Sequence, residues 1–236
     1  MDKKLNSNQK TARIAGILYL LMAVFSAFSL VYVDSKFYVP DNAAATASNV
    51  QTSELLFRLG FLSNLVGQII FLFLVHYLYK LLKSVDKDEA RLMVIFVITS
   101  VPVTMLNQLS QFAPVLLLND AEHVSAFNLA QLQAISMVFY DLHKMGIYIA
   151  EIFWGLWLFP FGILVFKSGF FPKWLGVLLV LGGIGYLIEC LVQFLFPEYK
   201  TIGYSAVAVS GLAEFACILW LLIKGVKIQT LTSTDQ

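Results

Sequence analysis

The sequence predicts an all-α, polytopic integral membrane bundle of six transmembrane helices, with both termini in the cytoplasm. Three observations predict it. Of the 236 residues, 59% are hydrophobic and only 13% are charged, about half the charged fraction of a soluble domain. The hydrophobic residues gather in six runs, each long enough to cross a hydrocarbon core about 30 Å thick. The basic residues concentrate in alternate gaps between these runs.

The six expected spans cover residues 12–33, 55–80, 92–118, 144–166, 174–196 and 203–223. Helices are expected because backbone groups in lipid must be hydrogen-bonded within their own segment, and the short alternating strands of a barrel are missing from the sequence. Short connections between the spans indicate antiparallel neighbours. We therefore expect one transmembrane domain over residues 1–228 and a polar tail over residues 229–236.

The first span follows three lysines, as a signal peptide would. Lys3, Lys4 and Lys10 precede an apolar run over residues 14–33. This run is too long for the hydrophobic region of a typical signal peptide. We expect an uncleaved first helix, with cleavage as the alternative.

The orientation follows from the distribution of lysine and arginine. Of the sixteen basic residues, four fall on one side of the expected spans: Lys36, Arg58, Lys144 and Lys200. The other twelve fall on the opposite side: Lys3, Lys4, Lys10, Arg13, Lys80, Lys83, Lys87, Arg91, Lys167, Lys173, Lys224 and Lys227. Basic residues in short loops favour the cytoplasmic side, so the larger set is predicted to lie there.

The two longer outer segments are expected to contain helices. In residues 34–54, Pro40 and Asp41 precede a run of alanines, and we expect Asp41 to cap a short helix. Residues 119–143 lack Gly and Pro and repeat apolar residues at helical spacing, with Asp120 as the expected cap. This segment either lies on the membrane surface or extends the fourth span outward. A seventh span is disfavoured because polar residues interrupt it.

Glycine and proline mark where spans pack or bend. Gly182, Gly183 and Gly185 let another helix approach the fifth span closely. Prolines inside the third and fourth spans free backbone carbonyls and bend helices. Packing is the preferred reading for both features, and gating is the alternative.

The polar residues inside the spans are the candidate functional residues, because such residues are costly in a bilayer and usually face the bundle interior or a water-filled cavity. Most fall in the outer half of the bilayer, whereas His76 lies near the inner end of its span. Tyr186, Glu189 and Gln193 share one helix face. We predict an outer-leaflet polar pocket lined by Arg58, Gln108, Gln111, Glu151, Glu189, Gln193 and Glu214.

A structural role is the alternative for many of these residues. Amides between membrane helices often only hold the helices together. Arg58 either pairs with one glutamate or extends toward the interface. One arginine does not neutralise Glu151, Glu189 and Glu214 together, so unpaired carboxylates must be protonated or bind a cation.

Cofactors and macromolecular partners are not indicated. The net charge of +1 gives no sign of a nucleic-acid partner. Cys190 and Cys217 lie in apolar runs, where cysteine is usually a small buried hydrophobe. The sequence contains no zinc-protease, nucleophile-elbow, phosphate-loop or dinucleotide motif. No metal site, cofactor or oligomeric state is therefore assigned, and the partner we expect is the lipid bilayer.

Several segments resemble one family. They include Ala12-Arg-Ile-Ala-Gly-Ile-Leu-Tyr-Leu-Leu21, Val39-Pro-Asp-Asn-Ala-Ala-Ala-Thr-Ala47, Glu54-Leu-Leu-Phe-Arg-Leu-Gly60, Phe171-Pro-Lys-Trp-Leu-Gly-Val-Leu-Leu179, Gly185-Tyr-Leu-Ile-Glu189, and Glu214 with Trp220-Leu-Leu-Ile-Lys-Gly225. Together they resemble a bacterial multi-pass membrane family known as domain of unknown function 4386. The resemblance implies a bacterial cytoplasmic membrane location and supplies no activity, cofactor or catalytic residue.

Three hypotheses about function remain from the sequence. The first is a small-molecule or ion binding or transport protein that uses the outer-leaflet pocket. The second is an intramembrane metal-dependent hydrolase that acts on a lipid-like substrate. The third is a structural or accessory membrane subunit. Whether the protein is an enzyme stays open at this point, and convergence of Glu151, Glu189 and Glu214 would favour the first two hypotheses.

Overall fold

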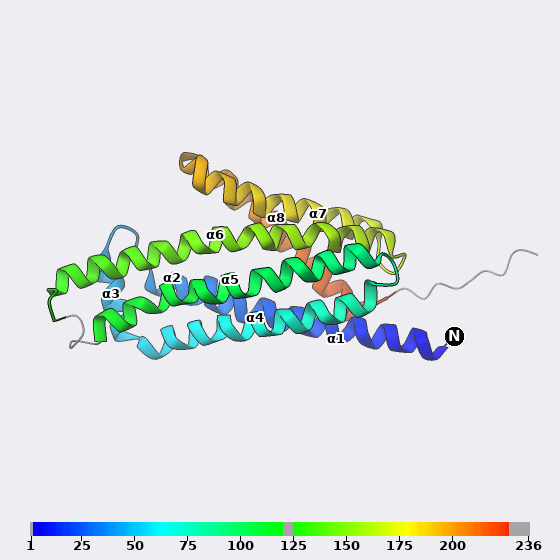
Figure 1. Cartoon of the computed structure of the whole chain (residues 1–236), viewed down its shortest axis with the longest axis horizontal. Coiled ribbons are helices and arrows are strands. Elements are labelled where there is room, and N and C mark those ends of the chain that lie inside the picture. The colour runs from blue at the N-terminus through cyan, green and yellow to red at the C-terminus, as the bar shows by residue number, and fades with distance from the viewer. Residues whose placement is uncertain (1, 120–124, 227–236) are drawn as a thin grey trace, which may run out of the picture. The chain divides into compact units, whose positions relative to one another are not determined.

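The chain folds into helices, and the residues that the structure describes contain no strand. The structure is a computed structural model that describes residues 2–119 and 125–226. Within these residues, six helical segments are long and apolar enough to cross a membrane (Figure 1). The prediction of an all-α, six-span membrane protein is confirmed. The predicted tail over residues 229–236 lies outside the described residues.

The main helices cover the expected spans except for Phe196, and most helices are longer than the span they contain. The first segment joins α1 (Asp2–Ala27), the π-helical turn η1 (Phe28–Val33) and α2 (Asp34–Phe37). The others are α4 (Glu54–Leu82), α5 (Lys87–Asn119), α6 (Leu129–Lys167), α7 (Lys173–Leu195) and α8 (Lys200–Ile223), with the short turn η2 (Pro197–Tyr199) before α8.

The loop between α2 and α4 contains the expected short helix, α3 (Ala43–Thr52), but with a different cap. Asn42 caps it, and its side-chain oxygen accepts a hydrogen bond from the backbone N–H of Ala45 at 2.9 Å. Asp41 instead adopts a left-handed backbone conformation with φ 57°. Because an N-cap residue normally has β-region dihedrals, the prediction that Asp41 caps α3 is wrong by one residue.

The segment before the fourth span extends that span. The backbone N–H of Asn128 donates to the side chain of Gln131, and the backbone N–H of Gln131 donates to the side chain of Asn128. This reciprocal arrangement starts a helix in the manner of a capping box. From Leu129, α6 runs for 39 residues without a break. Asp120, the residue expected to cap this segment, lies outside the described residues.

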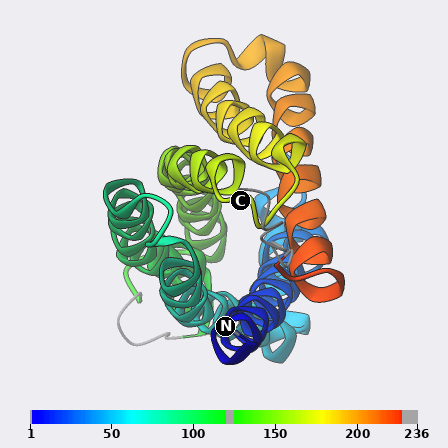
Figure 2. The same ribbon diagram turned by 90° about the vertical axis from the view of Figure 1, so that its right-hand side faces the viewer.

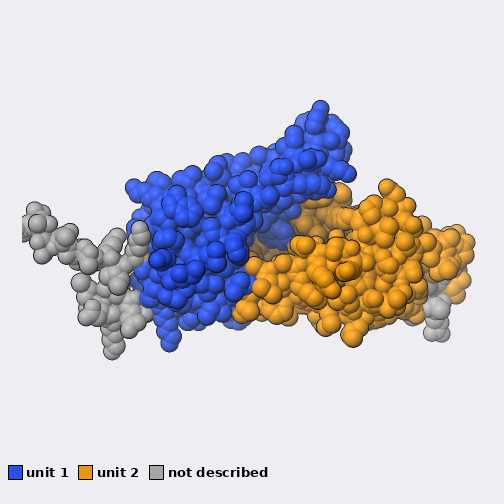
Figure 3. Space-filling view, turned by 180° about the vertical axis from the view of Figure 1, so that it is seen from behind, with its two compact units in different colours: residues 1–20, 72–99, 151–236 blue, residues 21–71, 100–150 orange. Residues whose placement is uncertain are grey.

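The chain divides into two compact units, coloured separately in Figure 3. Unit 1 comprises residues 1–20, 72–99 and 151–236, and unit 2 comprises residues 21–71 and 100–150. Each of α1, α4, α5 and α6 therefore contributes residues to both units, whereas α7 and α8 belong to unit 1 alone.

Glycines bring helices together in unit 1. A Cβ atom on Gly183 would lie 2.8 Å from the carbonyl oxygen of Gly155, so α6 and α7 approach at backbone distance. On the other side of α7, Ser210 donates a hydrogen bond to the carbonyl oxygen of Gly182 at 2.5 Å. Figure 2 shows α7 and α8 running beside one another. The packing role predicted for the glycines of the fifth span matches these contacts.

The beginning of α1 meets the end of α8 within unit 1. The Arg13 guanidinium donates to the carbonyl oxygens of Leu222 and Ile223, and Gln9 donates to the carbonyl oxygen of Lys224. These bonds satisfy carbonyls that a helix leaves unpaired at its C-terminus. The first and last spans thus have neighbouring ends, and the side of the membrane that these ends face stays a prediction.

Unit 2 has an apolar core at the α2–α3 loop. Phe37 and Phe57 pack edge to face with ring centroids 5.1 Å apart. A Cβ on Gly60 would lie 2.6 Å from Val33, so α4 and η1 pack closely there. The fully buried members of this core are Val33, Phe37, Val50, Phe57, Val115 and Tyr140.

Candidate functional site

The predicted pocket residues are divided between the two units. Glu151, Glu189, Gln193 and Glu214 belong to unit 1. Arg58, Gln108 and Gln111 belong to unit 2.

Glu214 is held by two tyrosines from other helices. The Tyr19 hydroxyl on α1 donates to one carboxylate oxygen at 2.9 Å, and the Tyr186 hydroxyl on α7 donates to the other at 3.0 Å. Because both donors are neutral, they hold the carboxylate without cancelling its charge. The contact joins three helices at one carboxylate.

Glu151 and Glu189 are buried carboxylates with unused hydrogen-bonding capacity. Their exposed fractions are 6% and 4%. In each, the Oε2 atom is buried and has no hydrogen-bond partner among the described residues. The backbone of Gly203 on α8 packs against Glu189, since a Cβ there would lie 3.4 Å from the Cα of Glu189. Such groups are costly in a membrane interior unless they are protonated or bind a cation.

Tyr186 lies among all three carboxylates. Glu151 and Glu189 interact electrostatically with one another, and Tyr186 interacts with Glu214, Glu151 and Glu189. Tyr186 also packs edge to face on Trp154, with ring centroids 6.1 Å apart. The three carboxylates therefore gather in one region of unit 1, which we call the carboxylate cluster. Among the described residues, none of the three forms an ion pair.

Gln193 extends the face that carries Glu189. It lies four residues later on α7 and is partly buried, and its Nε2 atom has no partner among the described residues. The stripe predicted from Tyr186, Glu189 and Gln193 thus carries a carboxylate oxygen and an amide nitrogen that have no hydrogen-bond partner among the described residues.

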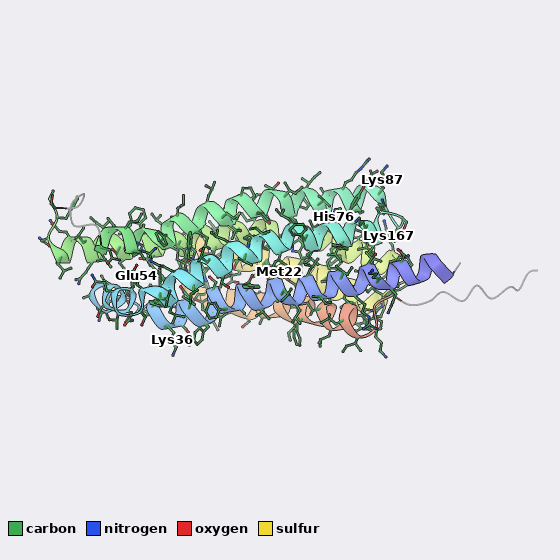
Figure 4. The ribbon with its side chains drawn as sticks, turned by 90° about the horizontal axis from the view of Figure 1, so that it is seen from below. Met22, Lys36, Glu54, His76, Lys87 and Lys167 are labelled. Atoms are coloured by element: carbon green, nitrogen blue, oxygen red, sulfur yellow. The ribbon has the colours of Figure 1, made fainter. Side chains whose placement is uncertain are left out.

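Arg58 has a partner outside the predicted pocket. Its Nε atom donates to Glu54 at 2.6 Å, one helical turn earlier on α4, and its side chain is 45% exposed. The guanidinium also lies over the Phe112 ring, 5.1 Å from the centroid. Glu54 accepts a second hydrogen bond from Asn119 at 2.7 Å. Arg58 therefore forms an ion pair with Glu54 at the surface of unit 2. Glu54 is labelled in Figure 4.

Two glutamine amides of α5, Gln108 and Gln111, are buried, and neither amide atom of Gln108 has a hydrogen-bond partner among the described residues. Gln108 and Gln111 are 1% and 2% exposed, whereas Leu106 and Leu109 on the same helix are more than half exposed. The amides therefore face away from the apolar surface of the helix. Unit 2 contains further buried polar atoms without a partner among the described residues, in Ser29, Asn64, Gln68, Gln108, Gln111, Ser136 and His143.

His143 is fixed by Asn107 on α5. The Asn107 amide donates to the carbonyl oxygen of His143 at 2.8 Å, and its nitrogen lies 3.2 Å from Nδ1 of the same residue. The backbone of Gly146 leaves room for the Asn107 side chain. The Nε2 atom of His143 is buried and has no partner among the described residues. Unit 2 thus holds a neutral polar set that differs in chemistry from the carboxylate cluster.

Tyr38, between α2 and α3, lies among charged groups of unit 2. The Lys144 ammonium lies 3.1 Å from the centroid of its ring, and the ring stacks on Tyr140 at 5.1 Å. The Tyr140 hydroxyl donates to Asp34. Burial, with the negative charge of Asp141 as the next cause, raises the pKa of the Tyr38 hydroxyl above its usual range.

Metal ligands do not cluster in the part of the chain that the structure describes. No group of three or more His, Cys, Asp or Glu side chains there has the arrangement needed to hold a metal ion. The carboxylates of unit 1 share Tyr186 as a neighbour without forming such a group. The metal-dependent hydrolase hypothesis therefore gains no ligand set from the described residues.

Tyr19, which binds Glu214 of the carboxylate cluster, was not predicted from the sequence. Its hydroxyl lies in an apolar run and its partner is 195 residues away. The available signal was a tyrosine inside a span, remote from the interfaces where tyrosine is usually enriched. Ser29 and Ser136 were missed for a similar reason, because a lone serine in a helix gives no pattern.

Comparisons with known proteins identify the family. The sequence profile described as Domain of unknown function (DUF4386) matches residues 14–225. An uncharacterized protein from Archaeoglobus fulgidus is 34% identical over 119 residues, which cover 47% of this chain and 68% of the relative. No solved structure matches. The profile covers most of the chain, so this multi-pass membrane protein belongs to the family Domain of unknown function (DUF4386).

Proposed function

We propose that the protein binds a proton or a small cation at its carboxylate cluster and acts as a small membrane transporter or sensor. The observation that carries this proposal is the gathering of Glu151, Glu189 and Glu214 around Tyr186 without an ion-pair partner among the described residues. Removing a carboxylate from water costs several kcal/mol. A structural role alone does not explain three such groups in one region.

The three carboxylates have different roles in this proposal. Glu214 already accepts two hydrogen bonds and joins α1, α7 and α8, so it positions Tyr186. Glu151 and Glu189 each keep one oxygen without a partner among the described residues. These two oxygens are the proposed ligands for the cation or the sites that carry the proton.

A separate observation in unit 2 supports the binding of a polar solute. Its buried amides and the Nε2 atom of His143 have hydrogen-bonding capacity that the described residues do not use. Buried polar groups are normally satisfied by protein or water. We propose that this neutral set binds water or an uncharged polar part of a solute.

We also propose that the protein lies in a bacterial cytoplasmic membrane with both termini inside. The contact between the beginning of α1 and the end of α8 supports termini on one side. Both ends are basic, with Arg13 on α1 and Lys224 after α8. Basic residues next to spans favour the cytoplasmic side.

The test uses the full chain in liposomes that contain a pH-sensitive dye. Protons, Na⁺ and methylammonium are the probes, each driven by an imposed gradient. We expect the wild type to transport at least one probe. In the Glu151→Gln/Glu189→Gln double variant, we expect the flux of that probe to fall at least about tenfold, which corresponds to an increase of about 1.4 kcal/mol in the activation free energy. Glu198→Gln is the matched control, because Glu198 is an exposed carboxylate of the same unit.

Two results would contradict the proposal. One is unchanged flux in the double variant. The other is a wild type that neither transports nor binds any of the three probes, with binding measured by equilibrium dialysis in detergent. Retained flux in Glu214→Gln with lower thermal stability would agree with the positioning role of Glu214.

A further inference from the structure

A groove on unit 1 combines apolar walls with one polar end. It lies between α4 and α5 and has a volume of about 510 Å³. Its polar lining residues are His76, Tyr79 and Arg91, and its apolar walls include Leu72, Ile95 and Ile98. Leu72, Ile95 and Ile98 are each more than one third exposed. The groove is therefore open on the apolar surface that a membrane helix presents to lipid.

The polar and apolar residues are ordered along the groove. The helices α4 and α5 are joined by a short turn at residues 83–86 and run in opposite directions. Tyr79 and Arg91 are the lining residues nearest that turn, whereas Leu72 and Ile98 are the farthest from it. On each helix the lining residues recur three or four positions apart, so they share one face. The groove thus changes from cationic to apolar along its length.

Further cations surround the polar end. The Lys83 ammonium lies 5.7 Å from the centroid of the Tyr79 ring. Figure 4 shows His76, Lys87 and Lys167 toward the same end of unit 1. Three acidic residues also lie at this end, Asp86, Asp88 and Glu89. Asp86 binds Lys167 at 3.0 Å, and Asp88 binds Arg91 at 3.2 Å.

Arg91 keeps most of its hydrogen-bonding capacity. Only its NH1 atom contacts Asp88, and the two side chains are 56% and 90% exposed. Exposed pairs of this kind contribute little free energy. A guanidinium has five N–H donors and is well matched to the oxygens of a phosphate.

We propose that this groove binds one anionic phospholipid. The phosphate is bound by Arg91 and Tyr79, with His76 beside it, and an acyl chain lies along Leu72, Ile95 and Ile98. Charge complementarity selects this occupant, since basic residues next to membrane helices attract anionic lipid. The inference does not depend on the function proposed for the carboxylate cluster.

The test is lipid binding by native mass spectrometry of the full chain in neutral detergent. Phosphatidylglycerol and phosphatidylcholine with identical acyl chains are the probes. We expect the wild type to bind one phosphatidylglycerol at least about tenfold more tightly than phosphatidylcholine, and Arg91→Gln to remove that preference. Lys173→Gln is the matched control, because it removes an exposed basic charge from unit 1 outside the groove.

A second variant tests the apolar wall without changing charge. Ile95→Trp fills the groove from an exposed position, and we expect it to weaken phosphatidylglycerol binding about as much as Arg91→Gln does. Leu181→Trp, exposed on α7, is its control. Circular dichroism and thermal unfolding confirm that each variant folds.

Several outcomes would overturn the proposal. They are a wild type without preference between the two lipids, an Arg91→Gln variant that keeps the preference, and a Lys173→Gln variant that loses it equally. Competition by glycerol phosphate as strong as competition by the lipid would also overturn it, because the acyl chain would then contribute nothing.

Discussion

The hydroxyl of Tyr19 donates a hydrogen bond to the carboxylate of Glu214 at 2.9 Å, although the two residues are 195 positions apart. The contact joins α1 to α8 inside unit 1, and Tyr186 completes it from α7. Both donors are neutral hydroxyls, so these two hydrogen bonds bring no positive charge to the Glu214 carboxylate.

Removing the Tyr19 hydroxyl should destabilise the protein. Tyr19→Phe deletes one of two hydrogen bonds to the partly buried Glu214 carboxylate, and a hydrogen bond to a charged group contributes about 1.5–3 kcal/mol. Thermal unfolding in detergent measures the loss, with Tyr204→Phe at an exposed position as control. In combination with Glu214→Gln the two losses should not add, because the residues share one interaction. Fully additive losses would contradict the pairing.

Adding a methyl group at Gly185 should separate α7 from α8. A Cβ atom there would collide with the carbonyl oxygen of Ala206 and lie 2.7 Å from the Ser210 hydroxyl. Gly185→Ala should therefore cost about 1–3 kcal/mol. Gly211→Ala is the control, because nothing lies within 4 Å of its added Cβ. It should be neutral or stabilising by up to about 1 kcal/mol. Equal effects of both variants on unfolding would contradict the close packing.

The contribution of Asp86 to stability should disappear in acid. The Lys167 ammonium, as the main cause, and the backbone N–H of Glu89 hold the pKa of Asp86 below its usual value of 3.8. A carboxyl with a lowered pKa stabilises the folded state above its unfolded pKa, and this stability is lost as the pH falls through the folded pKa. Lys167→Met should be less stable than wild type at neutral pH, and the difference should shrink below about pH 4. A difference that is independent of pH would contradict the pairing.

The predicted orientation is tested by labelling single cysteines in sealed cells. Lys173→Cys and Lys36→Cys lie in expected loops on opposite sides, and both native cysteines are buried. We expect a membrane-impermeant maleimide to label the residue at position 36 in intact cells and the residue at position 173 only after lysis. Labelling of position 173 in intact cells would reverse the orientation.

The membrane helices were predictable because the length of each hydrophobic run is enough to identify a membrane-spanning helix. Every expected span lies within a helix except for Phe196, which falls one residue beyond α7. Tyr186 and Glu189 were placed on one face by helical spacing, and that geometry is local. The partner of Arg58 was also local, since Glu54 lies one turn away.

Contacts between distant helices were not predictable. Nothing in the sequence pairs Tyr19 with Glu214 or Asn107 with His143, because each pair depends on which helices become neighbours. The cap of α3 was misassigned for a different reason. Asp41 and Asn42 are both good caps, and only the left-handed backbone at Asp41 selects Asn42.

The most direct test of the carboxylate cluster is infrared difference spectroscopy of the protein in lipid. Protonated carboxyl groups absorb separately from ionised ones. We predict that a protonated-carboxyl band loses intensity when the pH is raised or a bound cation is added. The band should weaken in Glu151→Gln and in Glu189→Gln and stay unchanged in Glu198→Gln. A wild-type spectrum without this band, or a band that both buried-site variants retain in full, would contradict the proposal that these carboxylates bind a proton or a cation.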